Sequence, residues 1–364
     1  MIDEALTEYL DAVQQGWADL CAARQPLAPV DLADGSRYLA AIIEGALTFV
    51  HADPAAPVFV PWTTPDRRWA DNGADSAYWM APVDGNHRYR IHGTRLEECY
   101  LSFTVYAGTP GHPERVASNA NHLALGAANH AVYDLVVEPP ADACYVIARQ
   151  YYLDPAHDVA ATMRIDVIDG PAPVVPDDAA VAARWRAAAG FVQAMTRPPA
   201  PPSGQPSYVS TEVNTIGAPA GWKAEEGGGR GTPDQTYALG RFRLDDGEAL
   251  VMDVAVPPCT YASAVLWNRF GQSIDVRRHR STINHRQMAV ADGRTARIVV
   301  AHEDPGVPNW LDTGGRHEGT VFWRFLLAEE PPGTIHAQVV PLEVVSLGIS
   351  TPPPGEEDDQ SGET

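Results

Sequence analysis

Hydrophobic residues recur at helical spacing over the first fifty positions of the chain. Two stripes repeat every three or four residues, and they comprise Leu6, Leu10, Val13, Trp17 and Leu20, then Leu39, Ile42, Ile43 and Leu47. An apolar stripe with this period is typical of an amphipathic helix that buries one face. We therefore expect residues 1–60 to form an N-terminal helical segment whose stripes face a core.

From residue 61 the pattern changes to short runs of β-branched and aromatic residues, separated by Pro, Gly, Asn and Asp. Many short strands bounded by turn residues are typical of a β-sandwich or barrel. We predict a mainly β protein with two tandem, jelly-roll-like β-sandwich domains, at residues 61–172 and 208–350.

A helix and a proline-rich connector separate these two β regions. Residues 177–196 are rich in alanine and begin with acidic residues, which suits a helix N-terminus. The sequence RPPAPPSGQPS at 197–207 favours an extended connector, so 173–207 is assigned to an inter-domain helix and linker. Residues 351–364 are acidic and almost without apolar side chains, which predicts a disordered tail.

The two β regions resemble each other at an offset of about 160 residues. Six short matches keep their order: Asp75-Ser-Ala-Tyr78 with Asp234-Gln-Thr-Tyr237, Asp84-Gly85 with Asp246-Gly247, Cys99 to Ser102 with Cys259 to Ser263, Ser118 to His122 with Ser281 to His285, DLVV at 134–137 with RIVV at 297–300, and Arg149 with Arg324. Preserved order indicates a duplicated β domain. Features present in both copies are then interpreted as scaffold, and features present once as candidates for function.

Composition narrows the classes of partner. The chain has 26 basic and 47 acidic residues and a formal charge of -21, which repels DNA, RNA and anionic lipid. No run approaches the ~20 apolar residues of a membrane span, and the N-terminus lacks a signal-peptide pattern. We therefore expect a cytoplasmic protein with a small-molecule ligand and neither a nucleic-acid nor a membrane partner.

The four cysteines show no C-x-x-C spacing, so we expect reduced, mostly buried thiols.

One feature of the second copy alone is a basic cluster, RRHR at 277–280, in an otherwise acidic chain. An arginine fork suits a carboxylate, sulfate or phosphate group, although exposed clusters also pair with surface acids. A strand over 276–281 is expected to place Arg278 and Arg280 on one face. The predicted ligand-binding residues are Arg269, Arg278, Arg280, His285, Trp310 and Arg324.

The other feature is the stretch HEDPGVPNWLDTGGRHEGTVFWR at 302–324, where the second copy is longer by 12 residues (175 minus 163). Asp312 and His317 are the candidate catalytic acid–base pair. The histidines and acids of this stretch could also hold a metal, but no H-x-H or H-E-x-x-H spacing occurs, so no metal site is predicted and the cofactor is unknown. A structural alternative is a loop clasp in which a buried Arg324 receives Asp312.

The segments LWNRFGQSIDVRRHRSTINHRQ and DPGVPNWLDTGGRHEGTVFWR resemble the family catalogued as domain of unknown function 1214. Its D-P-G-x-x-N-W-L-D-T-x-G-x-x-x-G-x-x-x-x-R block maps onto Asp304, Pro305, Gly306, Asn309, Trp310, Leu311, Asp312, Thr313, Gly315, Gly319 and Arg324. The upstream half, with VDGNHRYRIHG and Arg149-Gln150-Tyr151, is similar to the sandwich domain that usually precedes the block. The resemblance implies two β-sandwich or jelly-roll-like domains with helical additions, and it assigns no activity. In that family the histidine is expected directly after the second glycine, whereas here Arg316 stands between Gly315 and His317.

Three hypotheses about function follow. The first is a site in the second domain acting on a polar or anionic small molecule, with Arg278 or Arg280 holding the ligand and Asp312 with His317 supplying acid–base chemistry. The second is a non-catalytic carbohydrate or small-molecule binding module, which needs at least one exposed ring among Trp267, Trp310 and Trp323. The third is a structural or assembly protein.

Overall fold

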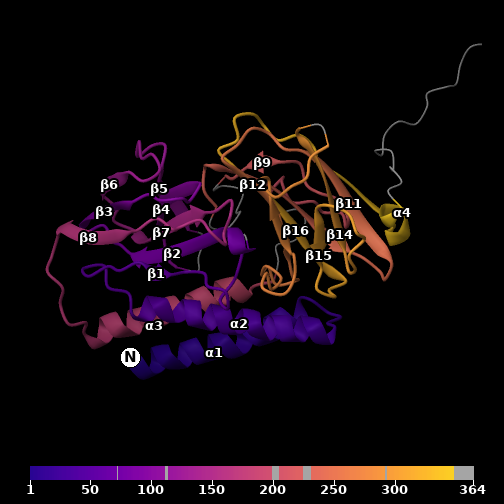
Figure 1. Ribbon diagram of the computed structural model, residues 1–364. Helices are drawn as coiled ribbons and strands as arrows, with labels where there is room; N and C mark the ends of the chain where they lie inside the picture. The colour runs from indigo at the N-terminus through magenta and orange to yellow at the C-terminus, as the bar shows by residue number, and fades with distance from the viewer. Residues whose placement is uncertain (72, 111–113, 199–204, 224–230, 292, 348–364) are drawn as a thin grey trace, which may run out of the picture.

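The computed structural model describes residues 1–71, 73–110, 114–198, 205–223, 231–291 and 293–347. This part of the chain forms 17 strands in four sheets together with four α-helices, so the prediction of a mainly β protein is confirmed (Figure 1). The predicted tail at 351–364 lies outside the described residues, as do residues 199–204 of the connector.

The first β unit, residues 60–169, contains two sheets. One has the strand order β1-β2-β7-β4-β5 and the other β6-β3-β8, and every neighbouring pair is antiparallel. The strands are β1 (Val60–Pro61), β2 (Ser76–Pro82), β3 (Arg88–Thr94), β4 (Tyr100–Ala107), β5 (Arg115–Asn121), β6 (Val132–Val137), β7 (Ala143–Tyr151) and β8 (Arg164–Asp169). A short 3₁₀ turn, Gly73–Asp75, precedes β2.

The second β unit, residues 220–341, also contains two sheets, with the orders β13-β12-β16-β10-β9 and β15-β14-β11-β17. Only β14 and β15 pair in parallel among its described strands. The strands are β9 (Ala220–Gly221), β10 (Gln235–Arg243), β11 (Glu248–Ala255), β12 (Tyr261–Trp267), β13 (Thr282–Asn284), β14 (Thr295–Ala301), β15 (Trp310–Asp312), β16 (Glu318–Leu326) and β17 (His336–Pro341).

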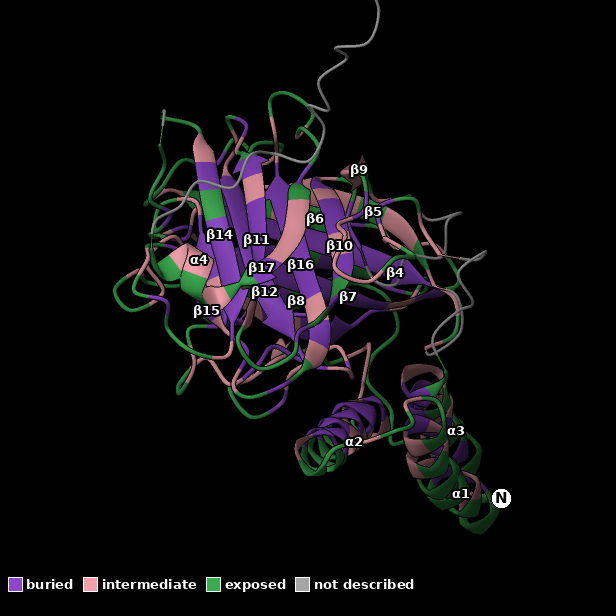
Figure 2. Cartoon of the chain, turned by 90° about the vertical axis from the view of Figure 1, so that its right-hand side faces the viewer, coloured by how far each residue is buried: buried purple, intermediate pink, exposed green. Residues whose placement is uncertain are grey.

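An apolar core lies between the two sheets of each unit, because successive side chains of a strand point to opposite faces. In the first unit this core includes Leu101, Phe103 and Val146, and in the second it includes Leu250 and Trp323. Figure 2 shows the buried residues concentrated on the strands of the second unit.

The opposite faces of the two five-stranded sheets are also buried. Tyr78 and Tyr100 of the first unit and Tyr261 of the second belong to one core cluster with residues of the helices, among them Phe191. The two β units therefore meet through the outer faces of these sheets.

Three helices, α1 (Ile2–Ala22), α2 (Pro29–Val50) and α3 (Asp178–Thr196), lie side by side along one edge of the β units (Figure 1), and short α4 (Leu342–Ser346) follows β17. The predicted helix at 177–196 is confirmed, with the Asp177 carboxylate accepting a 2.8 Å hydrogen bond from the Ala180 amide as a cap. Among the described residues, no helix is both long and apolar enough to traverse a bilayer.

The buried stripe of α1 differs from the predicted one. Leu6 and Leu10 are 36% and 58% exposed, so the prediction that they face the core is wrong. The buried face consists of Ala5, Tyr9, Ala12, Gly16 and Leu20. Small residues allow a closer approach to α3 than leucines would, since a Cβ added at Gly16 would lie 2.9 Å from the Thr196 side chain.

Candidate ligand site between the two β units

A cavity of about 370 Å³ lies between the two β units. Strands β2 and β7 supply one wall and β10, β12 and β16 the other. Seven of the 17 lining residues are aromatic: Trp62, Trp69, Tyr78, Tyr208, Tyr237, Trp267 and Phe322. Exposed Ala70 and half-buried Val209 and Leu239 also line it, so the cavity reaches the surface.

Two arginines extend into this wall from the middle of strands. Arg149 on β7 and Arg324 on β16 are each 4% exposed. Arg149 donates to the hydroxyls of Thr104 at 2.8 Å and Tyr106 at 2.7 Å. Arg324 donates to the Tyr78 hydroxyl at 2.7 Å, and its guanidinium carbon lies 4.8 Å from the centre of the Phe322 ring. Such aromatic faces favour a nearby cation.

Hydrogen-bond donors in this wall lack acceptors. The Nε of Arg324 and the side-chain nitrogen of Gln235, which is 2% exposed, are buried and have no hydrogen-bond partner among the residues that the structure describes. Within the part of the chain that the structure describes, no carboxylate forms an ion pair with Arg324; buried Asp71, which acts on it electrostatically, is paired with Arg68 at 2.8 Å. The wall thus presents donors and positive charge, which suits an acceptor or an anion.

The electrostatics of Arg324 agree with this geometry. Burial lowers the pKa of its guanidinium, Tyr78 opposes that change, and the positive charge of Arg149 lowers the pKa further. Arginine nevertheless stays protonated in proteins because its ordinary pKa is above 12. Arg324 therefore brings a full positive charge into a poorly solvated wall.

The predicted basic strand is not formed. Residues 276–279 form a turn instead, in which the amides of Arg278 and His279 both donate to the Asp275 carbonyl at 3.0 Å, so the expectation of a strand over 276–281 is wrong. Asp275, a short polar residue before the turn, favours this local bonding over a ladder. Arg278 has a side chain that is 71% exposed, and Arg280 is exposed as well.

Arg269 belongs to a contact with the helical segment. Its guanidinium donates to the carbonyls of Pro26 at 2.7 Å and Arg24 at 2.6 Å and to the Asp31 carboxylate at 3.2 Å. Of the predicted arginines, Arg324 lines the aromatic cavity, whereas Arg269, Arg278 and Arg280 do not.

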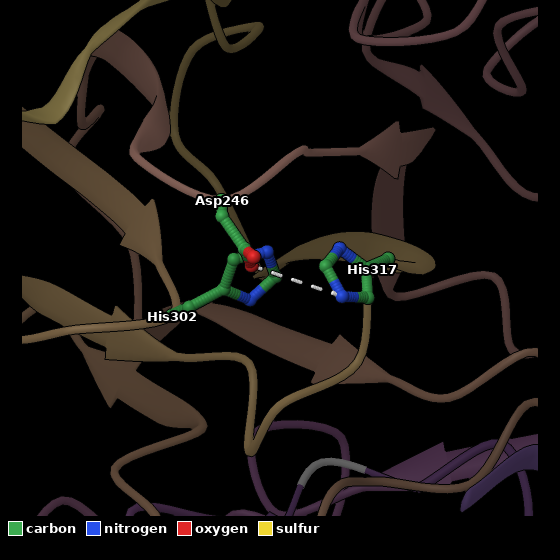
Figure 3. Close-up of side chains that lie close together, drawn as sticks. All are labelled: Asp246, His302 and His317. Carbon is green, nitrogen blue, oxygen red and sulfur yellow. Dashed lines mark ion pairs between the residues drawn. The ribbon is translucent and has the colours of Figure 1, made fainter. Parts of the chain in front are cut away.

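Asp312 and His317 have different partners. The Asp312 carboxylate lies 2.7 Å from His279 Nδ1 and accepts from the Gly314 amide at 2.7 Å. His317 Nδ1 lies 2.8 Å from the Leu244 carbonyl. Its ring packs beside His302, with centroids 4.7 Å apart, and its Nε2 lies 3.9 Å from Asp246 (Figure 3). No hydrogen bond or ion pair between described residues joins the predicted pair.

Much of the 302–324 stretch is held by internal and long-range bonds. Asn309, at a positive φ of 60°, donates to the carbonyls of Ala289 at 2.7 Å and Arg297 at 3.0 Å. Arg316 forms a buried bidentate pair with Asp34 of α2, at 2.6 and 2.8 Å. The 302–324 stretch is therefore clasped to α2 by Arg316. The sequence-based alternative paired Asp312 with Arg324, whereas the structure pairs Asp312 with His279.

The three candidate tryptophan platforms are not exposed. Trp323 is fully buried and Trp267 is 9% exposed, stacking on Phe322 at 4.2 Å and lining the cavity. Trp310 is half-buried and donates to the Ala301 carbonyl at 3.2 Å. A surface carbohydrate platform built on these rings has no support, although Trp267 can contact a ligand inside the cavity.

His285, another predicted ligand-binding residue, follows β13 and bonds to the scaffold. Its Nδ1 accepts a 3.1 Å hydrogen bond from the Ala262 amide, and burial lowers the pKa of its imidazole. A ring that accepts from an amide and is partly desolvated stays neutral, so His285 stabilises the edge of the sheet by accepting from β12.

No family model matches the chain, and no curated protein does. Among solved structures, an uncharacterized protein from Burkholderia cenocepacia is similar at 28% identity with a TM-score of 0.83, covering 93% of this chain and 97% of that one. The VPA0106 protein from Vibrio parahaemolyticus matches at 14% identity and a TM-score of 0.47, covering 84% of this chain and 98% of that one. The Burkholderia cenocepacia protein therefore shares this architecture over almost the full length of both chains.

Sequence reasoning missed Gln235, Arg316 and Asp34. Arg316 and Asp34 are separated by 282 positions, and no local motif marks either as half of a pair. Gln235 directly follows the repeated Asp234, which was the available signal.

Proposed function

We propose that this protein binds an anionic small molecule in the cavity between its β units. The observation that carries the proposal is the buried Arg324, whose Nε faces no acceptor and which has no carboxylate partner among the described residues. Burying an ion without a bonded counter-ion costs on the order of several kcal/mol, so a site that keeps one is commonly completed by a ligand of opposite charge. A carboxylate, sulfonate or phosphate can accept from the guanidinium and from the Gln235 amide together.

The body of the ligand is proposed to be flat or apolar. Trp267 stacks on Phe322 at 4.2 Å, and Trp62 and Trp69 line the same space. Aromatic walls favour ring-shaped or aliphatic groups, and polar groups at fixed points set the orientation. The volume of about 370 Å³ suits a compact organic acid rather than an oligosaccharide.

We also propose that the two β units are jelly-roll-like sandwiches derived by duplication, in the family of domain of unknown function 1214. In support, β2-β7-β4-β5 and β10-β16-β12-β13 have the same order under the six sequence matches, as do β6-β3-β8 and β14-β11-β17. The register agrees to the residue. Arg149 stands opposite Tyr78 and Ser102, and Arg324 opposite Tyr237 and Ser263.

Calorimetric titration tests the binding proposal. Benzoate, phenylacetate and phenyl phosphate are compared with uncharged benzamide on the wild type, Arg324→Met and Arg278→Met, which removes an exposed arginine that does not line the cavity. At least one anion is expected to bind the wild type and Arg278→Met equally, and to lose at least ~10-fold affinity in Arg324→Met, because a charge-assisted bond is removed. Equal anion binding by all three proteins, or none by any, contradicts the proposal.

An architectural role for Arg324 makes a different prediction. If the arginine only completes the junction, Arg324→Met removes its hydrogen bond to the Tyr78 hydroxyl and lowers the free energy of unfolding in plain buffer by about 1–3 kcal/mol. If it holds a ligand, the variant keeps most of its stability in plain buffer and loses only the additional stability that the anion provides. A ligand at 100 times its Kd adds about 2.7 kcal/mol, which denaturation can resolve.

A further inference from the structure

Three metal-ligating side chains meet at one end of the second β unit, apart from the aromatic cavity. Asp246 lies in the turn between β10 and β11, His302 directly follows β14, and His317 directly precedes β16 (Figure 3). One donor atom from each lies within 4.8 Å of the others. Nitrogen and oxygen ligands bind transition metals at about 2.0–2.2 Å, so a cation at their centre would draw these donor atoms closer together.

Both imidazoles are oriented through a second nitrogen. His317 Nδ1 lies 2.8 Å from the carbonyl of buried Leu244, whose amide in turn donates to the His317 carbonyl at 2.9 Å. His302 Nδ1 lies 2.6 Å from the hydroxyl of Thr313, which is fully buried. Histidine ligands in metal sites usually hold their other ring nitrogen in such a bond, since it selects the tautomer and aims the free nitrogen.

A competing contact sets the condition for binding. His302 Nε2 lies 3.2 Å from the Leu244 carbonyl, so in the absence of a cation this nitrogen can keep a proton and donate there. A cation selects the other tautomer, in which Nδ1–H donates to Thr313 and Nε2 offers its lone pair. The Leu244 carbonyl then keeps the shorter bond from His317.

We propose that Asp246, His302 and His317 bind a divalent transition-metal ion, with zinc the best fit. Two imidazoles and one carboxylate are borderline ligands that suit Zn²⁺, Co²⁺ and Ni²⁺, whereas Mg²⁺ and Ca²⁺ prefer sites made only of oxygen ligands. Water completes the coordination, because the side chains of Asp246 and His317 are 96% and 55% exposed. The site shares no residue with the aromatic cavity, so it stands or falls independently of the proposed anion binding.

The sequence spacing hides this group. The three residues come from separate turns, and their nearest spacing is the 15 positions between His302 and His317. The fold brings them together because three parts of the chain lie at the same end of the unit: the β10–β11 turn, the C-terminal end of β14 and the N-terminal end of β16. The backbone hydrogen bond from Leu244 to His317 joins the first of these parts to the last.

Titration with zinc chloride tests the proposal on the full chain after removal of metal with a chelator. One equivalent of Zn²⁺ is expected to bind, with at least ~10-fold weaker affinity in His317→Gln and His302→Gln. Asp246→Asn provides a second test that does not depend on the core, because that side chain is exposed. Co²⁺ should show visible absorption at one equivalent that zinc abolishes, and Mg²⁺ at the same concentration should not compete.

The matched control is His157→Gln, since His157 and Asp154 form another exposed histidine–carboxylate pair, at 3.0 Å, to which the described part of the chain adds no third metal ligand. It should bind zinc as the wild type does. The proposal is overturned if the wild type binds no stoichiometric zinc, if the three site variants bind it as tightly as the wild type, or if His157→Gln weakens binding to the same extent.

Discussion

The hydroxyl of Tyr261 in the second β unit donates a 2.9 Å hydrogen bond to the carboxylate of Asp75 in the first. The reverse contact also exists, with Tyr100 of the first unit donating to Asp234 of the second at 2.6 Å. Under the proposed duplication these are the same two positions exchanged between copies. A contact from i to j and from j to i is typical of an interface between identical subunits, so this reciprocity is what the proposed duplication predicts for two copies that paired symmetrically.

Asp75 makes this junction sensitive to pH. Burial raises the pKa of its carboxyl to about 6, although bonds from Tyr261 and Asn284 oppose the change. An aspartate in the unfolded chain has a pKa of about 3.9, so the folded state binds the proton more tightly. Stability from Asp75 is therefore present in acid and is lost as the pH rises from about 4 to about 6. The loss is on the order of 3 kcal/mol.

Asp75→Asn isolates this effect, because an amide oxygen can accept the same two bonds without ionising. The difference in free energy of unfolding, wild type minus variant, should fall between pH 4 and pH 6 in urea denaturation curves. Asp134→Asn is the control of opposite sign, since the bond from Arg90 lowers the pKa of Asp134 and its contribution is lost as the pH falls. A flat difference for Asp75→Asn would count against a buried, protonated carboxyl.

The Arg316–Asp34 pair should be the costliest contact to break in the 302–324 stretch. Their side chains are 9% and 5% exposed, so Arg316→Met leaves an unpaired carboxylate buried against α2. We expect a loss of about 3–5 kcal/mol, most of which returns in the double variant Arg316→Met/Asp34→Asn. Arg297→Met breaks the more exposed pair with Asp253, also at 2.8 Å, and should cost about 1 kcal/mol or less. Equal losses in the two arginine variants, measured by chemical denaturation, would refute the clasp.

The sequence anticipated what local pattern controls. Residues 177–196 were assigned as a helix because acidic residues precede an alanine-rich run, and Asp177 caps α3 accordingly. The hydrophobic pattern gave the wrong buried face for α1. This helix buries the small residues Ala12 and Gly16, which allow a close approach to α3, and exposes Leu6 and Leu10. Features present in both β regions were interpreted as scaffold. Arg149 and Arg324 occupy matched positions, so that interpretation did not select the cavity that they line. The fold brings both to the cavity between the two β units, and a comparison of the two sequence segments does not reveal that these positions line one cavity.

Close packing of β16 against Trp267 and Phe242 requires a glycine at position 319. A Cβ there would lie 2.4 Å from the Trp267 carbonyl and 2.6 Å from the Phe242 ring, so Gly319→Ala must push strands apart. We expect a loss of about 2–3 kcal/mol. Gly315→Ala is the comparison, because Gly315 has a positive φ of 74° and open space around it, which gives a loss of about 1 kcal/mol from backbone strain alone. Thermal denaturation should rank Gly319→Ala as the less stable variant; the reverse order would contradict the packing argument.

The thiols of Cys99 and Cys259 should react slowly in the folded protein. Burial raises the pKa of the Cys259 thiol to about 11 and raises that of Cys99 as well, and the Cys99 thiol donates to the Tyr151 carbonyl at 3.3 Å. The thiolate is the reactive form, so at pH 8 iodoacetamide should modify Cys259 about 100-fold more slowly in the native protein than in urea, where the ordinary pKa of about 8.5 applies. Mass spectrometry of the peptides over time measures both rates, and the reaction in urea shows that the reagent is active. Native labelling of Cys259 as fast as in urea would mean that its sulfur is accessible and ionised, contrary to its position against the second core.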